Sequence, residues 1–344
     1  MLLKIFKLVV LLLLVGAVTV WFLFFKSNTQ FAGNQKAFYI HSGTPTATEV
    51  LASLEKDSIL SNTGSFKLAA DRIGYWKNIK PGRYVIKRNM SVLDVLRKLK
   101  NGQQDPVNFT IVKIRVPEDL AKMAGRKFEP DSLAFVEYLE KDITRAYKII
   151  PDTYSLLWTN SPEKTITRLN EEYEEWWAKN DRKVKAKSLG YSAFEIMTIA
   201  SIVEEETNRQ EDKGKIASVY MNRLKINMPL QADPTVRFSK RDFKAHRVYF
   251  KDLKTQSDYN TYLNRGLPPT PICTPSQATI DAVLDAPKTD YIYFVAHPDL
   301  TGGSVFNKDY SQHQKDAKIY QDSLTAWLKR KAEKEPVKDS GNTQ

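Results

Sequence analysis

Three consecutive glutamates stand in the segment SIVEEETN, residues 201–208. The segment ends a stretch whose apolar residues recur at helical spacing, about 100° per residue. On a helical wheel the apolar side chains gather on one arc, and they are Ile196, Met197, Ile199, Ala200 and Val203. Glu204 falls inside this arc, Glu205 falls opposite it and is expected in solvent, and Glu206 falls at its edge. The wheel therefore separates three adjacent carboxylates.

A carboxyl group on a half-buried apolar face has its charged form disfavoured, which raises its pKa. Glu204 is therefore expected to stay protonated closer to neutral pH than an exposed glutamate. A protonated carboxylic acid is what general-acid cleavage of a glycosidic bond requires. The alternative is a buried glutamate paired with an arginine, for instance Arg223 on the next predicted helix, because ion pairs also perturb carboxylates. The wheel alone leaves both interpretations open.

A long irregular region, residues 229–277, is rich in Pro, Gly, Asn, Gln, Asp and Tyr. Such turn-rich loops can form one wall of a cleft for a polymer, since tyrosine rings stack on sugars and amides bond to their hydroxyl groups. The residues that we expect there are Gln231, Asp233, Asn260 and Tyr262. The alternative is that the prolines only stiffen a long connection.

Other classes of site have little support. The four histidines are scattered, none at metal-ligand spacing on a helix, so no metal is expected; they are His41, His246, His297 and His313. No GxSxG elbow, Walker loop or Rossmann glycine pattern is present, and no cofactor is expected. Cys273, the single cysteine, lies between prolines and is expected to be inert. The net charge is +12, but no nucleic-acid-binding signature accompanies it, so nucleic acid is not an expected partner.

The N-terminus carries an uncharged apolar run from Leu8 to Phe25, about 27 Å long as a helix. Lys4 and Lys7 precede the run, and Lys26 follows it. The run is longer than the core of a cleaved signal peptide, and no small-x-small cleavage site follows it. We therefore expect an uncleaved, single-pass signal anchor in the membrane, with residues 27–344 on its outer side.

The rest of the chain mixes segregated helices and short strands, which is typical of the α+β class. The expected strands are 37–40, 81–86, 107–116, 291–296 (buried) and 304–307. The main expected helices are 46–57, 65–77, 91–102, 162–178, 193–209, 211–226, 275–286 and 308–332, with capping residues Ser91 and Ser192. The expected organisation is an anchor (1–26), a linker (27–35), a compact module (36–112), a transition segment (113–150), a second domain (151–333) and a solvated tail (334–344).

Several motifs together resemble one known family. IASIVEEET is followed by KIASVYMNRL, LQADPTV, YNTY, GLPPTPI and YIYFVA. Their order and spacing over residues 145–325 are similar to those of the YceG-like endolytic murein transglycosylases, and PDTY (151–154) fits the start of that domain. The family's members carry one N-terminal membrane helix and a small LysM-like module. The resemblance therefore implies that residues 36–112 are LysM-like and that residues 151–333 are the catalytic domain.

The resemblance implies that Glu204, the first glutamate after SIV, is the catalytic residue. It further implies cleavage between N-acetylmuramic acid and N-acetylglucosamine within a glycan strand, with 1,6-anhydro ends as products. One glutamate suffices in such a reaction, because the sugar's own C6 hydroxyl replaces the water that a second carboxylate would activate. The expected partners are peptidoglycan glycan strands, inner-membrane lipid around the anchor, and cell-wall synthases. The expected role is to terminate or trim nascent strands.

Two other functions compete with this one. A muramidase-type hydrolase would cut the same bond with water, using Glu204 and Asp233. A non-catalytic, membrane-anchored scaffold would bind glycan through the LysM-like module and recruit synthesis enzymes. The sequence also departs from the family where Ser276 replaces the usual glycine after the GLPP loop, and where RAYKII precedes PDTY. These departures bear on the fit of the substrate.

Overall fold

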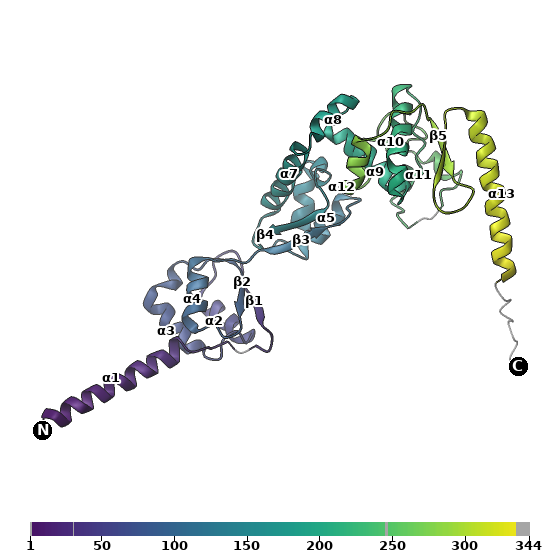
Figure 1. The fold of residues 1–344 in the computed structure, drawn as a ribbon. Coiled ribbons are helices and arrows are strands. Elements are labelled where there is room, and N and C mark those ends of the chain that lie inside the picture. Colours follow the sequence, from purple (N-terminus) through teal and green to yellow (C-terminus); the bar gives the residue numbers. More distant parts are fainter. Residues whose placement is uncertain (1, 30, 245–246, 335–344) are drawn as a thin grey trace, which may run out of the picture. The chain divides into compact units, whose positions relative to one another are not determined.

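A computed structural model describes residues 2–29, 31–244 and 247–334 (Figure 1). The chain divides into two compact units. The first comprises residues up to 110 with 121–138 and 153–165, and the second comprises 111–120, 139–152 and 166 onward. Two segments that the sequence assigns to the transition and to the second domain thus pack with the N-terminal unit. The predicted tail beyond residue 334, and residue 30 of the predicted linker, lie outside the described residues.

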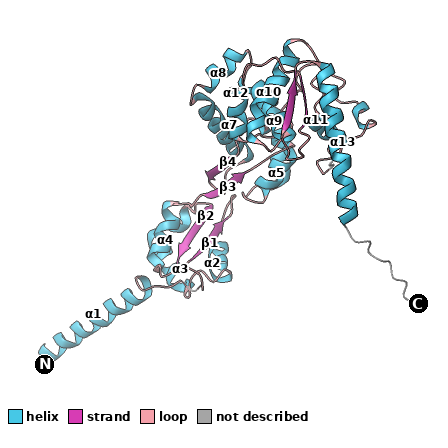
Figure 2. Cartoon of the chain, turned by 45° about the vertical axis from the view of Figure 1, so that its right-hand side comes forward, coloured by secondary structure: helices cyan, strands magenta, loops and turns pink. Residues whose placement is uncertain are grey.

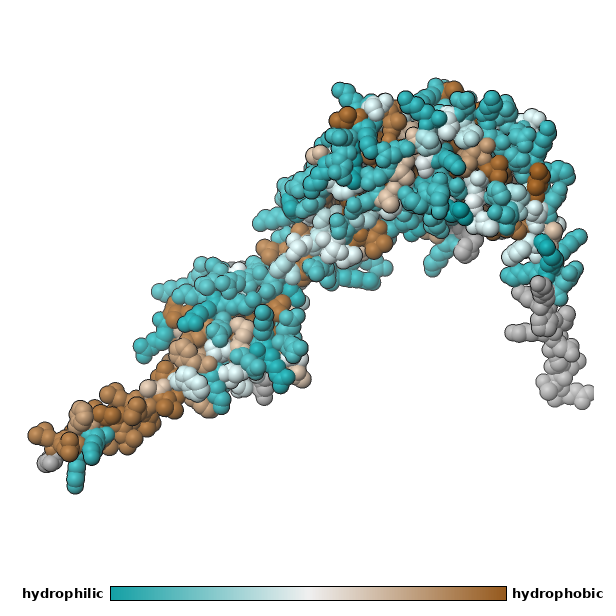
Figure 3. Space-filling model, viewed as in Figure 1, coloured by the Kyte–Doolittle hydropathy of each residue, from teal (hydrophilic) through white to brown (hydrophobic). Residues whose placement is uncertain are grey.

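The first helix, α1 (Leu2–Phe24), has no buried residue. Its surface is apolar along nearly its whole length, drawn brown in Figure 3. Within the described part of the chain it is the one helix that is long and apolar enough to cross a membrane. One N-terminal helix that could anchor the chain is thus present, as the sequence predicts.

The first unit contains an antiparallel pair of strands, β1 (Gln35–Ile40) and β2 (Gly82–Lys87). Two helices lie between them in the chain, α2 (Ala47–Lys56) and α3 (Thr63–Ile73), and α4 (Val92–Asn101) follows. The predicted order of strand, helix, helix, strand and helix is confirmed. As expected, Ser91 caps α4, and it forms a capping box with Asp94.

Large apolar side chains from all these elements fill the core of the first unit. Fully buried examples are Phe38, Leu54, Phe66, Tyr84 and Leu96. The predicted linker also takes part, since Phe31 packs on this core and the Asn28 side-chain oxygen accepts a hydrogen bond from Ser61 at 2.6 Å. The described part of the segment 27–35 is therefore held against the unit.

Two further strands form a second sheet, β3 (Val107–Ile111) and β4 (Asp152–Leu156). The predicted strand 107–116 is thus too long. Beyond β3 the chain leaves the sheet, and the Ile114 amide donates to Thr274 Oγ1 at 2.9 Å. Between β3 and β4 the chain contains α5 (Pro117–Gly125), α6 (Ser132–Glu140) and the 3₁₀ turn η2 (Ile143–Ala146), whereas the 3₁₀ turn η1 (Tyr75–Lys77) follows α3 in the first unit.

The second unit is mainly helical (Figure 2). Its helices are α7 (Pro162–Ala178), α8 (Arg182–Leu189), α9 (Ala193–Glu206), α10 (Gln210–Lys225), α11 (Asp233–Ser239), the 3₁₀ turn η3 (Asp252–Lys254), α12 (Gln277–Leu284) and α13 (Tyr310–Lys334). Strands β5 (Tyr293–Ala296) and β6 (Ser304–Asn307) pair antiparallel. Helix α9 packs against α8, α10, α11 and α12. The chain thus combines an N-terminal apolar helix with a mixed helical and sheet fold.

Three details of this unit differ from the sequence prediction. Helices α8 and α11 lie in segments for which no helix was predicted. The strand predicted as buried is β5, whose side chains are half-buried or exposed. Its sheet has only two strands, so β5 has a neighbouring strand on one edge only.

Candidate active site

Helix α9 carries the three glutamates at its C-terminal end. The predicted capping box starts it, because Ser192 Oγ accepts from the Glu195 amide and Glu195 accepts from the Ser192 amide at 2.7 Å. Every residue from 196 to 203 is buried, so the helix is surrounded by protein on all sides. The three glutamates that follow therefore enter three different protein environments.

Glu204 lies among polar partners. Its Oε2 accepts hydrogen bonds from Lys213 Nζ at 3.0 Å, from Ser276 Oγ at 3.0 Å, and from Thr279 Oγ1. Lys213 is a buried residue on α10, and its side chain is 8% exposed. Burial acts to raise the pKa of Glu204, but the hydrogen bonds from Thr279 and Lys213 and the lysine charge outweigh it, so the pKa is lowered.

The expected raised pKa of Glu204 is therefore wrong. The wheel treats the helix alone, whereas the cation and the two hydroxyls come from α10 and from the start of α12. The alternative of a buried ion pair describes Glu204 better, although the partner is Lys213 and not Arg223. Ser276, which replaces the glycine usual in the family, also belongs to this site. Its hydroxyl both caps α12 and bonds to Glu204.

Glu205 forms ion pairs and does not face open solvent. Its carboxylate lies 2.8 Å from Lys113 Nζ and 3.1 Å from Arg115 Nη2, and its side chain is 16% exposed. Burial acts to raise its pKa, and the two cations lower it by more. The predicted solvent position is wrong because the chain, after leaving β3, passes this face of α9.

Glu206 differs from both neighbours. Burial and the negative charge of Asp233 raise its pKa to about 7, although a hydrogen bond from Tyr220 and the charges of Arg237 and Arg223 oppose the rise. The Tyr220 hydroxyl donates to Glu206 Oε2 at 3.3 Å. A carboxyl with this pKa can give and take a proton at neutral pH, which is the property of a general acid and base.

The four predicted loop residues are only partly brought together. Asp233 is the first residue of α11 and accepts a hydrogen bond from the Tyr262 hydroxyl at 2.7 Å. Gln231 is exposed beside them, with φ of 50°. Asn260 is fully buried and bonds to backbone carbonyls within its own loop, so it orders the loop. The negative charge of Asp233 raises the pKa of Glu206.

Sequence reasoning missed the roles of two residues on α10. Tyr220 bonds to Glu206, and Arg223 donates from Nε to the Ile292 carbonyl at 2.7 Å and from Nη1 to the Leu230 carbonyl at 2.6 Å. The two side chains are three residues apart and so share a face of the helix. The three-residue spacing of Tyr220 and Arg223 within KIASVYMNRL was the feature of the sequence that could have shown that they share a helix face.

None of the remaining candidates that the structure describes hydrogen-bonds to the three glutamates. Cys273 is fully buried and burial raises its pKa, as expected of an inert thiol. His41 and His297 each lie beside one carboxylate at the surface, and His313 stacks on a tyrosine. His246 lies outside the described residues.

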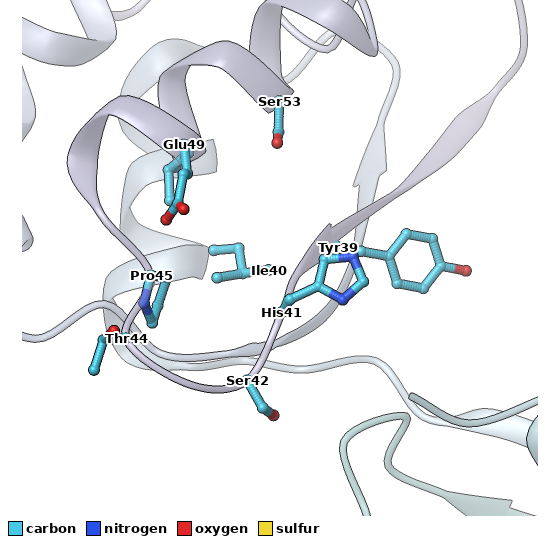
Figure 4. A pocket seen from close by; sticks show the side chains of 9 residues that line it. Tyr39, Ile40, His41, Ser42, Thr44, Pro45, Glu49 and Ser53 are labelled. Carbon is cyan, nitrogen blue, oxygen red and sulfur yellow. The ribbon is translucent and has the colours of Figure 1, made fainter. Parts of the chain in front are cut away.

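A cavity of about 390 Å³ lies in the first unit, where β1 turns into α2. Figure 4 shows its lining, which includes Tyr39, His41, Ser42, Glu49 and Ser53. The Trp158 ring meets the rings of both Tyr39 and His41 edge-on, at centroid distances of 4.9 and 5.1 Å. Hydroxyl, imidazole and aromatic groups thus meet at one concave surface.

Comparison with known proteins finds one family. The sequence profile of the YceG-like family matches residues 38–319. An endolytic murein transglycosylase of Bacillus subtilis (strain 168) is 38% identical over 179 residues, covering 50% of this chain and 47% of that protein. One of Streptococcus pneumoniae serotype 2 (strain D39 / NCTC 7466) is 27% identical over 321 residues, covering 81% of this chain and 57% of that protein. This chain thus spans about half the length of the curated relatives it matches.

A solved structure is also similar. The crystal structure of the yceG-like protein lmo1499 from Listeria monocytogenes superposes with a TM-score of 0.53 at 26% identity, covering 83% of this chain and 99% of that one. The likeness therefore extends over most of the described fold.

Proposed function

This chain belongs to the YceG-like family, and we propose that it is an endolytic lytic transglycosylase that cuts peptidoglycan glycan strands. The names of the relatives from Bacillus subtilis and Streptococcus pneumoniae support the activity. The observation that carries the proposal is the carboxyl of Glu206, whose pKa of about 7 suits both halves of such a reaction.

We propose Glu206 as the acid and base, in preference to Glu204. Glu204 has a lowered pKa and three hydrogen-bond donors on one oxygen, so it holds its charge and has little capacity to donate a proton. Glu206 has one tyrosine partner and lies near Asp233 and Tyr262. The earlier assignment of Glu204 remains the competing prediction.

In the proposed reaction the C1–O4 bond between N-acetylmuramic acid and N-acetylglucosamine breaks, and a C1–O6 bond forms within the muramic acid. Glu206 gives its proton to the departing O4. The resulting carboxylate then takes the proton of the C6 hydroxyl as O6 attacks C1, which returns Glu206 to its starting state. No water is consumed, and proximity of O6 to C1 supplies the nucleophile.

Asp233 supports this reaction through its charge. Its carboxylate accepts from Tyr262 and raises the pKa of Glu206. In the competing muramidase-type reaction, Asp233 would instead activate water or attack C1.

The two reactions give different products from the same bond. The full chain in detergent should be incubated with purified sacculi, and the soluble muropeptides analysed by mass spectrometry. We expect 1,6-anhydro-muramic acid ends. Reducing ends would show that the chain is a muramidase-type hydrolase. Sacculi that remain intact would instead favour the non-catalytic, glycan-binding scaffold.

We further propose that the first unit is a LysM-like module that binds glycan, and that the cavity between β1 and α2 contributes to binding. The element order and the aromatic and hydroxyl lining of the cavity support this. Substituting Ser53 and His41 with alanine should weaken pelleting of the full chain with sacculi. Unchanged pelleting would contradict the proposal.

Helix α1 is proposed to anchor the chain in the inner membrane, with the bulk of the chain in the periplasm beside cell-wall synthases. The apolar surface of α1 and the lysines that precede it support this orientation. Protease added to spheroplasts should digest the chain. A protected full-length chain would contradict the orientation, and a mature N-terminus near residue 26 would contradict the uncleaved anchor.

A further inference from the structure

Arg223 is a buried cation that joins two parts of the second unit. It is 7% exposed, and it donates to the Ile292 carbonyl, just before β5, and to the Leu230 carbonyl, just before Gln231. One guanidinium therefore fixes the start of β5 relative to the loop that leads into Asp233. Because a buried arginine needs its hydrogen bonds satisfied, this connection is rigid.

The same guanidinium lies over the ring of Tyr293, with 5.7 Å between Cζ and the ring centroid. His313 stacks on Tyr293 as well, with 5.1 Å between centroids and 18° between planes. Helix α13, which carries His313, is tied to β6 by a hydrogen bond of 2.9 Å from Asn307 to Asp316. Arg223 and His313 therefore hold the Tyr293 ring in one orientation.

The hydroxyl groups near Arg223 are not equally engaged. The Tyr220 hydroxyl donates to Glu206, and the Tyr262 hydroxyl donates to Asp233. Both of these tyrosines lie close enough to act electrostatically on the Arg223 guanidinium, and so do Tyr293 and Glu206. Among the described residues, no group hydrogen-bonds to the hydroxyl of Tyr293, and its side chain is half-buried. The Tyr293 hydroxyl thus belongs to a ring that Arg223 and His313 hold in place, no described residue engages it, and it shares with Glu206 the electrostatic field of Arg223.

We propose that Tyr293 is a substrate-contacting residue, whose hydroxyl hydrogen-bonds a sugar next to the cleaved bond, and that Arg223 and His313 are positioning residues for it. This inference rests on the proposed function. A phenol hydroxyl both donates and accepts, so it suits a sugar hydroxyl or an N-acetyl carbonyl group. The exposed Tyr310, whose ring centroid lies 5.5 Å from that of Tyr293, leaves this side of α13 aromatic.

The test compares Tyr293→Phe with the unaltered full chain in detergent, on soluble uncross-linked glycan strands. The substitution removes the hydroxyl and keeps the ring, so the melting temperature should not change. A hydrogen bond to the substrate is worth about 1 kcal/mol, so KM should rise about 5-fold with kcat nearly unchanged. The matched control is Tyr320→Phe on α13, since Tyr320 lines the surface near His297 and Leu300; it should leave KM unchanged.

Substitutions of His313 provide a second test, which distinguishes a lost orientation of the Tyr293 ring from a lost fold. His313→Ala should raise KM as Tyr293→Phe does, and His313→Phe should restore it because the stacked ring returns. Anhydro products from the unaltered chain with equal KM for Tyr293→Phe would overturn this inference alone. An unaltered chain that forms no anhydro products would overturn the proposed function, and this inference with it.

Discussion

Two carboxyl groups at the end of α9 stand two residues apart and have opposite electrostatics. Glu204 lies among a lysine and two hydroxyls, and its pKa is lowered. Glu206 lies beside a tyrosine and within the field of Asp233, and its pKa is raised to about 7. The difference comes from α10, α11 and α12, because the two glutamates share one helix and one side-chain chemistry.

This comparison shows that a buried carboxylate is not by itself a general acid. Burial acts to raise the pKa of both groups, and the hydrogen-bonding and charged partners decide whether the pKa ends above or below its ordinary value. Glu204 is a fixed charge that links α9 to α10 and to the start of α12. Glu206 is the group that can change its protonation at neutral pH. The following substitutions test this difference between Glu204 and Glu206 in catalysis, in stability and in response to pH.

The largest expected effect is on catalysis. Glu206→Gln removes the acid and base and keeps the size of the side chain, so formation of anhydro products should fall by about 10²–10⁴-fold or more. Glu204→Gln should keep most of the activity of the folded fraction. Both variants should be checked for folding by circular dichroism and assayed by quantifying anhydro-muropeptides. A dead, folded Glu204→Gln beside an active Glu206→Gln would return the catalytic role to Glu204.

The next effect is on stability around Glu204. Lys213→Met leaves a buried carboxylate without its cation, which costs about 3–5 kcal/mol of unfolding free energy. The control is Lys185→Met, since Lys185 pairs with Asp285 at the surface, with side chains 43% and 58% exposed. That change should cost less than about 1 kcal/mol. Equal losses in denaturant melts would mean that Lys213 is not a buried partner.

The two glutamates should also respond oppositely to pH. The folded pKa of Glu206 is above its ordinary value of 4.5, so this group lowers stability as pH rises from about 4.5 to about 7. Glu206→Gln should therefore stabilise the chain at pH 8, by at most about 3 kcal/mol. The folded pKa of Glu204 is lowered, so its stabilisation is present above pH 4.5 and is lost as pH falls through the folded pKa. Glu204→Gln should lower the melting temperature at pH 8, and a shift of the same sign for both would contradict the comparison.

The smallest effect concerns the glutamate between them. Glu205→Gln weakens the pairs with Lys113 and Arg115, which should cost about 1–2 kcal/mol with activity mostly kept. Glu211→Gln serves as the control, because Glu211 is 74% exposed and 3.8 Å from Arg209; it should change the melting temperature very little. If Glu205→Gln behaves like this control, its ion pairs do not form in solution.

Several features of the fold follow from local sequence. The capping residues Ser91 and Ser192 begin helices as expected, and the apolar arc of α9 is buried throughout. Helix α11 could also have been predicted, because Asp233 is followed by Pro234, and proline favours the first turn of a helix. Local signals of this kind depend only on neighbouring residues.

The roles of the three glutamates could not be assigned in the same way. A helical wheel assumes one buried face, but Ser201 and Ile202 are buried as fully as Val203, so α9 has no solvent face between residues 196 and 203. The charges that then set each pKa come from Lys213, Lys113 and other residues far along the chain. Motif resemblance points to this turn of the helix, and only the tertiary contacts distinguish its three glutamates.

The most direct test of the central claim is a titration of glutamate side-chain carboxyls by ¹³C NMR on the selectively labelled full chain. We predict one carboxyl signal that titrates near pH 7, that is absent from Glu206→Gln, and that moves to lower pH in Asp233→Asn because a negative charge is removed. The Glu204 signal should titrate below its ordinary range. A signal near pH 7 that persists in Glu206→Gln and disappears in Glu204→Gln would contradict the account.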